Sequence, residues 1–328
     1  MGIKRMFLLA ILCHAGLGFG SSPLKIGLVL NKAGKNDKSF NAGAYAGLTK
    51  AEKEFGFETK TVEASDDNAF FPALRGLAER QYNLIIAVGF SQAEAVSKVA
   101  PKYPKTNFVL VDAVVDGPNI RSLIFEEHEG SFLAGALGAM VSKTKHIGFV
   151  GGMDIPLIRR FFLGYEAGAK VVNKDMKVVS SYIGNTADAW INPARGKELA
   201  LAQMQGGADV VYSVAGSSGT GVFDAAEQQK TFAIGVDANQ NWMKPGRILT
   251  SMMKRVDVGV YDACHDLQKG KFSPGKKSFG LKNNGVELAF DEHNKSLVTA
   301  EQRKKLDELR QAIIDGKIVV PDYYKTKS

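Results

Sequence analysis

Lys25-Ile-Gly-Leu-Val-Leu30 is a short, almost uninterrupted apolar run, and His146-Ile-Gly-Phe-Val150 repeats its character further along the chain. Such runs are typical of parallel strands covered by helices on both faces, whereas a strand with one wet face alternates. Each run opens a series in which apolar runs alternate with amphipathic helical segments, the sequence form of a doubly wound sheet. The pattern therefore predicts an α/β fold with two such sheets.

The first series has further strand candidates at 58–62, 84–88 and 107–111, with helical segments at 41–55 and 71–80. The second continues at 178–183, 210–214 and 231–236. A chain of 328 residues is also long for one domain, and length alone favours two. We therefore expect two Rossmann-like lobes.

Segments 121–127 and 250–257 lie where the series change over, and we expect them to be strands that cross between the lobes. Helix 258–269 would return to the first lobe, a third crossing is expected near 272–275, and a last helix spans 299–315. Because no Pro-, Gly- or Ser-rich linker separates the halves, we expect a multi-strand hinge. The predicted division is 23–126 plus 254–273 for the N-terminal lobe and 127–253 plus 274–320 for the C-terminal lobe, with a tail at 321–328.

The first 22 residues have the pattern of a secretory signal peptide: Lys4 and Arg5 precede a short apolar run that ends in small residues. The run is short for a membrane span, although a retained anchor helix is the alternative. Cys13 follows Leu12, where lipoprotein signals carry a small residue, so we expect an exported, periplasmic protein rather than a lipid-anchored one. Cys264 then stands alone in the mature chain, which excludes an internal disulfide.

The charge is only mildly basic. Loss of Lys4 and Arg5 lowers the formal net charge from +8 to +6, and the remaining Lys and Arg residues are scattered among acids. Apolar residues make up 45% and charged residues 23%, as in a soluble globular protein. A solvated surface explains these charges better than nucleic-acid binding does.

Ligands of open α/β sheets bind beyond the carboxyl ends of the strands. The residues at those positions are polar or aromatic with few permanent charges, which suits a neutral, flat, hydroxyl-bearing ligand. Each has an ordinary alternative: Phe40 and Phe223 could be core, and Ser39 could belong to a helix N-cap. The candidates at or near strand ends are Asn31, Ser39, Phe40, Asn41, Asp112, Gly216, Ser217, Gly219, Phe223 and Asp237.

Enzyme signatures are missing. The cluster Gly216-Ser-Ser-Gly-Thr-Gly221 opens a helix but has neither dinucleotide spacing nor the Lys of a phosphate-binding loop. No G-x-S-x-G elbow occurs, and the five histidines are dispersed singly. We therefore expect no catalysis, no cofactor and no metal.

Five motifs occur in order across both lobes, and together they are specific. On them the chain resembles the basic membrane protein family of type I periplasmic solute-binding proteins, whose best understood branch is similar to a purine nucleoside receptor. The motifs are Asn36-Asp-Lys-Ser-Phe-Asn41, Gly148-Phe-Val-Gly-Gly-Met153, Ala215-Gly-Ser-Ser-Gly-Thr-Gly-Val-Phe-Asp224, Ile234-Gly-Val-Asp237 and Leu249-Thr-Ser-Met-Met-Lys-Arg-Val-Asp257.

The resemblance implies a purine base sandwiched between Phe40 and Phe223, with Asp112 on the base edge. It places the ribose near 216–219, bonded by Asp237 and Lys254. The chain departs from the family at Asn31, where relatives usually carry Asp. An amide can donate as well as accept, which leaves the preferred base open.

The expected function is therefore that of a monomeric receptor which delivers a purine nucleoside to the membrane permease of an ABC transporter. Two alternatives stay open: a binding protein for a sugar or another heterocycle, and a nucleoside-processing enzyme. Whether Phe40 and Phe223 face each other across the cleft would separate the nucleoside from the sugar.

Overall fold

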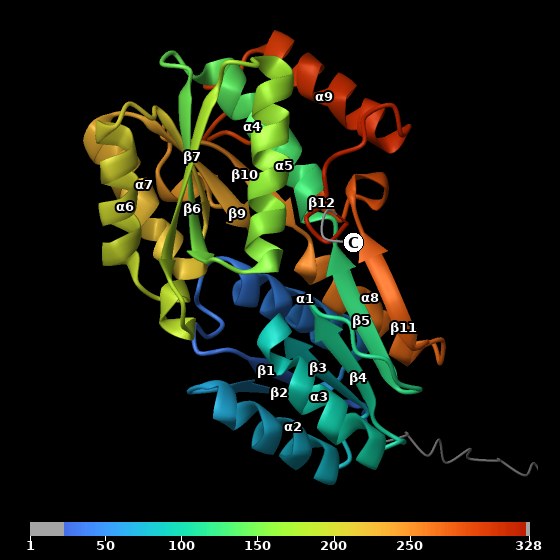
Figure 1. The fold of residues 1–328 in the computed structure, drawn as a ribbon. Coiled ribbons are helices and arrows are strands. Elements are labelled where there is room, and N and C mark those ends of the chain that lie inside the picture. Colours follow the sequence, from blue (N-terminus) through green and yellow to red (C-terminus); the bar gives the residue numbers. More distant parts are fainter. Residues whose placement is uncertain (1–22, 326–328) are drawn as a thin grey trace, which may run out of the picture.

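The computed structural model describes residues 23–325, so the predicted signal peptide and Cys13 lie outside the described residues. Within them the chain forms two six-stranded sheets, and each belongs to one of two lobes (Figure 1). The strand orders are β11-β5-β4-β3-β1-β2 and β12-β10-β9-β8-β6-β7. The two lobes therefore repeat one strand order, which confirms the predicted fold class.

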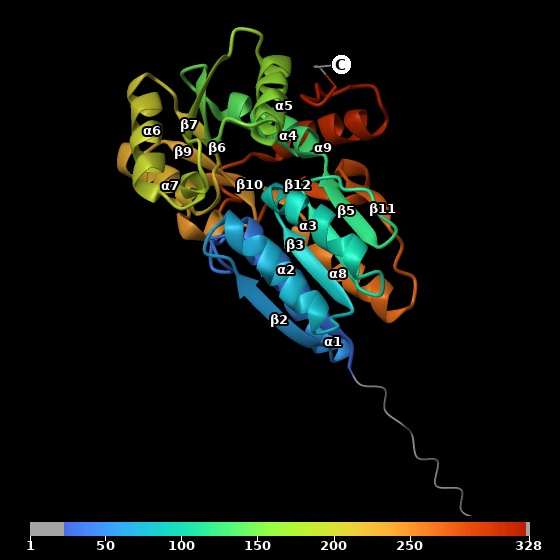
Figure 2. The same ribbon diagram turned by 60° about the horizontal axis from the view of Figure 1, so that its bottom comes forward.

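The first sheet is parallel throughout. Helices α1 (Phe40–Phe55) and α8 (Val256–Gln268) pack together on one face, and α2 (Phe70–Glu79) and α3 (Ala93–Val99) cover the other (Figure 2). Its strands are β1 (Lys25–Leu30), β2 (Glu58–Glu63), β3 (Leu84–Val88), β4 (Asn107–Val111), β5 (Ile120–Phe125) and β11 (Gly275–Phe279).

The second sheet is parallel except for β12, which runs antiparallel to β10. Its strands are β6 (His146–Met153), β7 (Lys177–Gly184), β8 (Val210–Val214), β9 (Phe232–Asp237), β10 (Ile248–Lys254) and β12 (Val286–Leu288). Its helices are α4 (Glu127–Val141), α5 (Pro156–Val172), α6 (Pro193–Gln205), α7 (Gly219–Gln229) and α9 (Ala300–Ile314).

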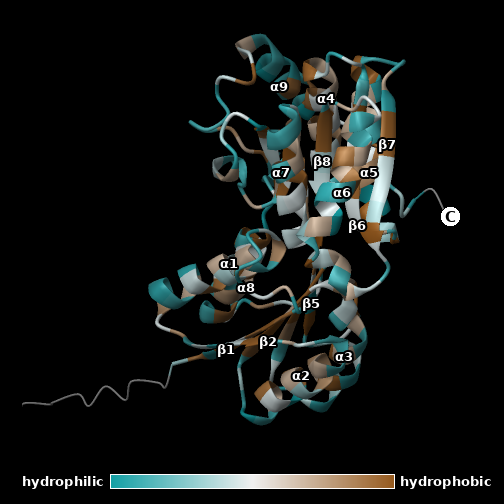
Figure 3. Cartoon of the chain, turned by 90° about the vertical axis from the view of Figure 1, so that its left-hand side faces the viewer, coloured by the Kyte–Doolittle hydropathy of each residue, from teal (hydrophilic) through white to brown (hydrophobic). Residues whose placement is uncertain are grey.

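Strand periodicity divides the core of each lobe into two layers. In β3, Leu84, Ile86 and Val88 join the core beneath α1 and α8, while Ile85 and Ala87 join the core beneath α2 and α3. All five are buried, which is why the run reads as continuously apolar. Figure 3 shows the result, with hydrophobic colour on strands such as β5 and β8 and hydrophilic colour on the outer helix α9.

The chain crosses between the lobes three times within the described residues. The first two crossings follow β5 and β10, as predicted. The third was predicted near 272–275 and is wrong, because β11 pairs with β5 in the first sheet and the chain crosses only after Phe279. β11 is an exposed edge strand containing Lys276 and Lys277, so only its pairing with β5 distinguishes it from a loop.

None of the helices in residues 23–325 is both long enough and apolar enough to span a bilayer.

Helices α4 and α5 approach so closely that glycines are required at their contact. A Cβ added at Gly168 would lie 1.9 Å from the carbonyl oxygen of Phe132, and one at Gly135 would lie 1.9 Å from that of Tyr165. Backbone cannot move aside as a side chain can. The contact also positions the space between the lobes, because α4 begins directly after the first crossing and α5 carries Ile158 and Phe161, which line a cavity there.

Gly168→Ala should lower the free energy of unfolding by about 1–3 kcal/mol or more, because the added methyl overpacks the helix contact. Gly76→Ala in α2 is the matched control, since a Cβ there meets nothing within 4 Å, and it should stabilise by up to about 1 kcal/mol through helix propensity. Denaturant unfolding of both variants measures the difference. Equal changes in unfolding free energy for the two variants would show that the contact between α4 and α5 accommodates an added methyl group.

Candidate functional site

The carboxyl ends of both sheets face one another and enclose a cavity of about 380 Å³ between the lobes. This volume lies within the range of small-molecule sites. The cavity is lined from the first lobe by Asn31, Phe40 and Asp112 and from the second by Trp190, Gly216 and Asp237, while Lys254 reaches it from the second crossing. A ligand held here would contact both lobes.

Aromatic rings line the cavity from both lobes. Phe40 begins α1 in the first lobe, and Trp190 ends a short turn after β7 in the second. Trp190 lies directly over Gly152, where a Cβ would come within 2.1 Å of the indole ring. The glycine thus makes room for the indole, and the two rings offer flat apolar surfaces to a planar ligand.

The deepest charge in the cavity is the ammonium group of Lys254, whose side chain is only 2% exposed. Its Nζ lies 2.7 Å from Oδ2 of Asp112 and 2.9 Å from Oε1 of Glu127. A buried charge of this kind needs partners because desolvation is costly. The other carboxylate oxygen of Asp112, Oδ1, is buried without a hydrogen-bond partner.

The protonation states of Asp112, Asp237 and Lys254 follow from their burial and their ion pairs. Burial raises the pKa of Asp112 to about 6, and Lys254 offsets part of that rise. Burial also raises the pKa of Asp237, offset by Lys254 and by the hydrogen bond from Ser39. Burial alone would lower the pKa of Lys254, but the surrounding Asp112, Glu127 and Asp237 raise it above its ordinary value, so the ammonium stays charged at neutral pH.

The two lobes touch across the cavity in this conformation. Ser39 donates a hydrogen bond to Asp237 over 2.5 Å, and the Gln240 side chain donates to the carbonyl of Lys38 over 3.0 Å. At the rim, Lys32 lies 2.7 Å from Asp188. These contacts hold the lobes closed over the cavity.

The loop before α1 is fixed from within. Asp37 is buried, and its carboxylate accepts hydrogen bonds from the backbone N–H groups of Ser39, Asn41 and Ala42, each over 2.9 Å. It thereby satisfies donors at the helix start that would otherwise lack partners. Burial raises the pKa of Asp37 to about 6, although the three backbone bonds lower it.

The amide of Asn31 has a fixed orientation. Its Oδ1 accepts from the backbone N–H of Ala33 over 3.0 Å, and a backbone N–H can only donate. The Asn41 side chain must then also donate to that oxygen, over 2.8 Å. The Nδ2 of Asn31 makes no hydrogen bond to another of residues 23–325 and lies at the cavity wall, so Asn31 presents a donor to the ligand.

Six of the eleven predicted site residues line the cavity: Asn31, Phe40, Asp112, Gly216, Asp237 and Lys254. Ser39 and Asn41 are buried behind it and hold Asp237 and Asn31 in place. Lys254 pairs with Asp112, so the two residues predicted to bind different parts of the ligand are in contact in this conformation.

Phe223, Ser217 and Gly219 do not line the cavity. Phe223 is 1% exposed and packs in the core beneath α6 and α7, so the predicted sandwich with Phe40 is not formed. The side chain of Ser217 donates to the carbonyl of Trp190 over 2.8 Å, and a Cβ at Gly219 would lie 2.4 Å from Oγ of Ser213. Both residues therefore support the loop that carries Gly216.

Sequence reasoning missed Trp190, which lines the cavity from the second lobe, where Phe223 was expected to do so. Trp190 does not directly follow a strand but lies in the turn Ala187–Trp190, reached by a bend after β7. The usable signal was the pair Gly151-Gly152, which indicates a close approach by a bulky group. Glu127 was also missed, because a carboxylate at the start of a helix has an ordinary role there.

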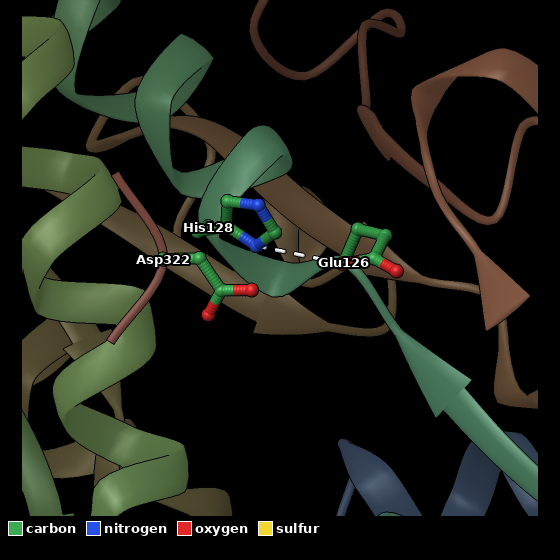
Figure 4. A group of neighbouring side chains, drawn as sticks. All are labelled: Glu126, His128 and Asp322. Atoms are coloured by element: carbon green, nitrogen blue, oxygen red, sulfur yellow. Dashed lines mark ion pairs between the residues drawn. The ribbon is translucent and has the colours of Figure 1, made fainter. Parts of the chain in front are cut away.

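A largely buried group of metal-type ligands occurs among the described residues: Glu126, His128 and Asp322, whose ligand atoms lie within 4.8 Å of one another (Figure 4). The guanidinium of Arg160 binds both carboxylates and so already stands where a cation would. Burial, with the charge of Arg160 next, lowers the pKa of His128 to about 4. The imidazole is therefore neutral at pH 7.

The chain is similar to known proteins over most of its length. The family model described as ABC transporter substrate-binding protein PnrA-like matches residues 25–323. A Lactococcus lactis protein named ABC transporter nucleoside-binding protein BmpA is 37% identical, over 91% of this chain and 89% of its own. Basic membrane protein A of Borreliella afzelii is 32% identical, over 94% and 95%.

A solved structure of an ABC transporter solute-binding protein from Aeropyrum pernix matches with a TM-score of 0.83 at 30% identity, covering 91% of this chain and 94% of that one. A glucose-galactose binding protein from Geobacillus stearothermophilus has a TM-score of 0.60 at 16% identity, covering 82% and 98%. At that identity the second likeness concerns the fold alone.

Phe223→Ala should lower the free energy of unfolding by about 3–5 kcal/mol, the usual cost of emptying a well-packed core. Phe40→Ala, which truncates a half-buried ring at the cavity, should cost clearly less. Denaturant unfolding of the ligand-free variants compares the two. If Phe223→Ala left stability unchanged, its ring would not be the core residue that the packing indicates.

Proposed function

The chain belongs to the family of PnrA-like ABC transporter substrate-binding proteins, and from this premise we propose that it captures a purine nucleoside in the cavity between its lobes. We further propose that it is exported by an N-terminal signal peptide and acts in the periplasm as a monomer. It then delivers the nucleoside to the membrane permease of an ABC transporter and catalyses no reaction.

The observation that carries this proposal is the buried, unpartnered Oδ1 of Asp112, a residue that lines the same cavity as Phe40 and Trp190. A buried carboxylate oxygen without a donor is costly, so a ligand N–H or O–H is the natural partner. A heterocyclic base offers both that donor and a flat face for the rings. The ribose hydroxyls would meet Asp237 and the backbone near Gly216.

The direct contacts between the lobes support a capture mechanism. Ser39 with Asp237, and Lys32 with Asp188, join residues of different lobes. A ligand that touches both lobes binds the closed form better than the open form and shifts the population toward it. A permease that recognises the closed form would then distinguish loaded from empty receptor.

The relatives favour a nucleoside over a sugar. The Lactococcus lactis relative is named a nucleoside-binding protein, and its similarity spans nearly the whole chain. The sugar-binding neighbours share the fold at low identity, and fold alone does not determine the ligand.

A purine nucleoside should raise the thermal stability of the protein, by about 2.7 kcal/mol at a concentration 100 times the dissociation constant. Phe40→Ala and Trp190→Ala should each weaken binding by about 1–3 kcal/mol through lost stacking. A thermal-shift screen of nucleosides, bases and sugars, followed by calorimetry on the variants, measures both effects. A response to free sugars alone would overturn the nucleoside assignment.

Asn31→Asp should change the preferred base. The wild-type Nδ2 donates to a ligand acceptor, whereas a carboxylate oxygen at that place requires a ligand N–H such as that of hypoxanthine or guanine. An unmatched buried acceptor costs about 1–3 kcal/mol, so the ratio of adenosine to inosine affinity should fall by about tenfold or more. Calorimetry with both nucleosides measures the ratio.

Asn41→Ser is the companion control for Asn31→Asp. It removes one of the two donors to Oδ1 of Asn31 but leaves the bond from Ala33 in place. It should keep the wild-type preference. An unchanged adenosine to inosine ratio in Asn31→Asp would mean that residue 31 only ties down its loop.

A further inference from the structure

Arg160 is the most heavily committed buried group outside the cavity. It lies on α5, is 3% exposed, and uses all five of its N–H donors. Two go to Asp322, at 2.8 and 3.1 Å, and one to Glu127 at 2.7 Å. The other two go to the Glu126 carboxylate and to the carbonyl of Phe125.

Directly, or through Glu126 and Glu127, Arg160 is linked to every part of the chain that joins the lobes. Phe125, Glu126 and Glu127 form the first crossing, and Glu127 also binds Lys254, the last residue of β10 before the second crossing. Glu126 accepts a hydrogen bond from Ser278 of β11, just before the third crossing, and its backbone N–H donates to the carbonyl of Phe279 over 2.8 Å. Arg160 therefore ties all three crossings to α5.

The same contacts form a continuous line of charges from the cavity to the chain's C-terminal segment. The order is Asp112, Lys254, Glu127, Arg160 and Asp322, and each neighbour pairs at 2.7–2.9 Å. Signs alternate along the line, so each charge is held by the next. Asp112, at one end, lines the cavity and has a buried Oδ1 without a hydrogen-bond partner, and Asp322, at the other, is 6% exposed.

We propose that Arg160 and Asp322 are positioning residues for ligand binding, and that the ring of Tyr324 supports them against the guanidinium. Asp322 holds the guanidinium, the guanidinium holds Glu127, and Glu127 holds Lys254 where it orients Asp112. This inference rests on the proposed function, because it assigns a support to the same cavity. Removal of the charge at Asp322 would let Arg160 draw Glu127 away from Lys254.

The experiment uses the full mature chain and calorimetry with adenosine and inosine. Asp322→Asn should weaken the binding of whichever nucleoside binds by about tenfold, within the range of measured couplings through packed networks. Asp322→Glu, which restores the charge, should recover most of the affinity. Tyr323→Phe is the matched control, since it removes the hydroxyl that accepts from exposed Arg159 and leaves Arg160 untouched.

A double-mutant cycle tests whether Asp322 acts on binding through Asp112 or only holds the C-terminal segment in place. If the line of charges acts as a unit, adding Asp322→Asn to Asp112→Asn weakens binding no further, whereas independent effects multiply. If Asp322→Asn does not fold, Tyr324→Leu, which removes the exposed ring 5.1 Å from the guanidinium, should still weaken binding by about threefold.

Two outcomes overturn the inference. Wild-type affinity in Asp322→Asn, or in Tyr324→Leu where only that variant folds, would show that the C-terminal segment does not support the site. Multiplicative effects in the cycle would show that Asp322 and Asp112 act separately. If the wild type binds no nucleoside, the proposed function fails and this inference fails with it. If the wild type binds a nucleoside and the variants bind it equally well, only this inference fails.

Discussion

The structure depends on one buried ammonium group. Lys254 keeps its charge at 2% exposure only because Asp112 and Glu127 hold it from two sides, at 2.7 and 2.9 Å. A buried charge that loses a partner is among the most destabilising changes a protein can suffer. Asp112 belongs to the first lobe, and Lys254 and Glu127 belong to two different crossings. The ion pairs therefore fix the position of the hinge relative to the floor of the cavity.

That constraint also shapes what the cavity can bind. The rings of Phe40, Phe125 and Phe161 lie 5.1–5.6 Å from the ammonium, so the charge sits in an apolar surround and is already neutralised. Hydrogen-bonding groups remain along the cavity wall, among them Nδ2 of Asn31, and Oδ1 of Asp112 is buried without a partner. A neutral ligand with both a donor and an acceptor on its rim suits such a site better than an anionic one, because Asp112 and Asp237 would repel a negative group.

The fold could be predicted because consecutive apolar positions are a local signal: β1, β3, β4 and β8 begin and end at the predicted residues. β11 could not, since it carries Lys276 and Lys277 in place of apolar residues and its place in the first sheet follows from pairing with β5. The site residues likewise fall into those that a local signal predicts and those that it does not. Residues at strand ends were found by position, but the choice between Phe223 and Trp190 depends on which ring the helix packing turns inward. Neither periodicity nor composition contains that information.

The backbone supplies an independent argument for the strand-end aspartates. Asp112 and Asp237 follow or end the equivalent strands β4 and β9 of the two lobes, and both adopt positive φ angles, 71° and 65°. Non-glycine residues seldom do so, and such conformations persist only where the surroundings impose them. Here the left-handed turn directs each carboxylate into the cavity instead of along its strand. Two lobes that share a strand order thus hold the same backbone conformation at matching places, and in each the residue is an acid that faces the other lobe.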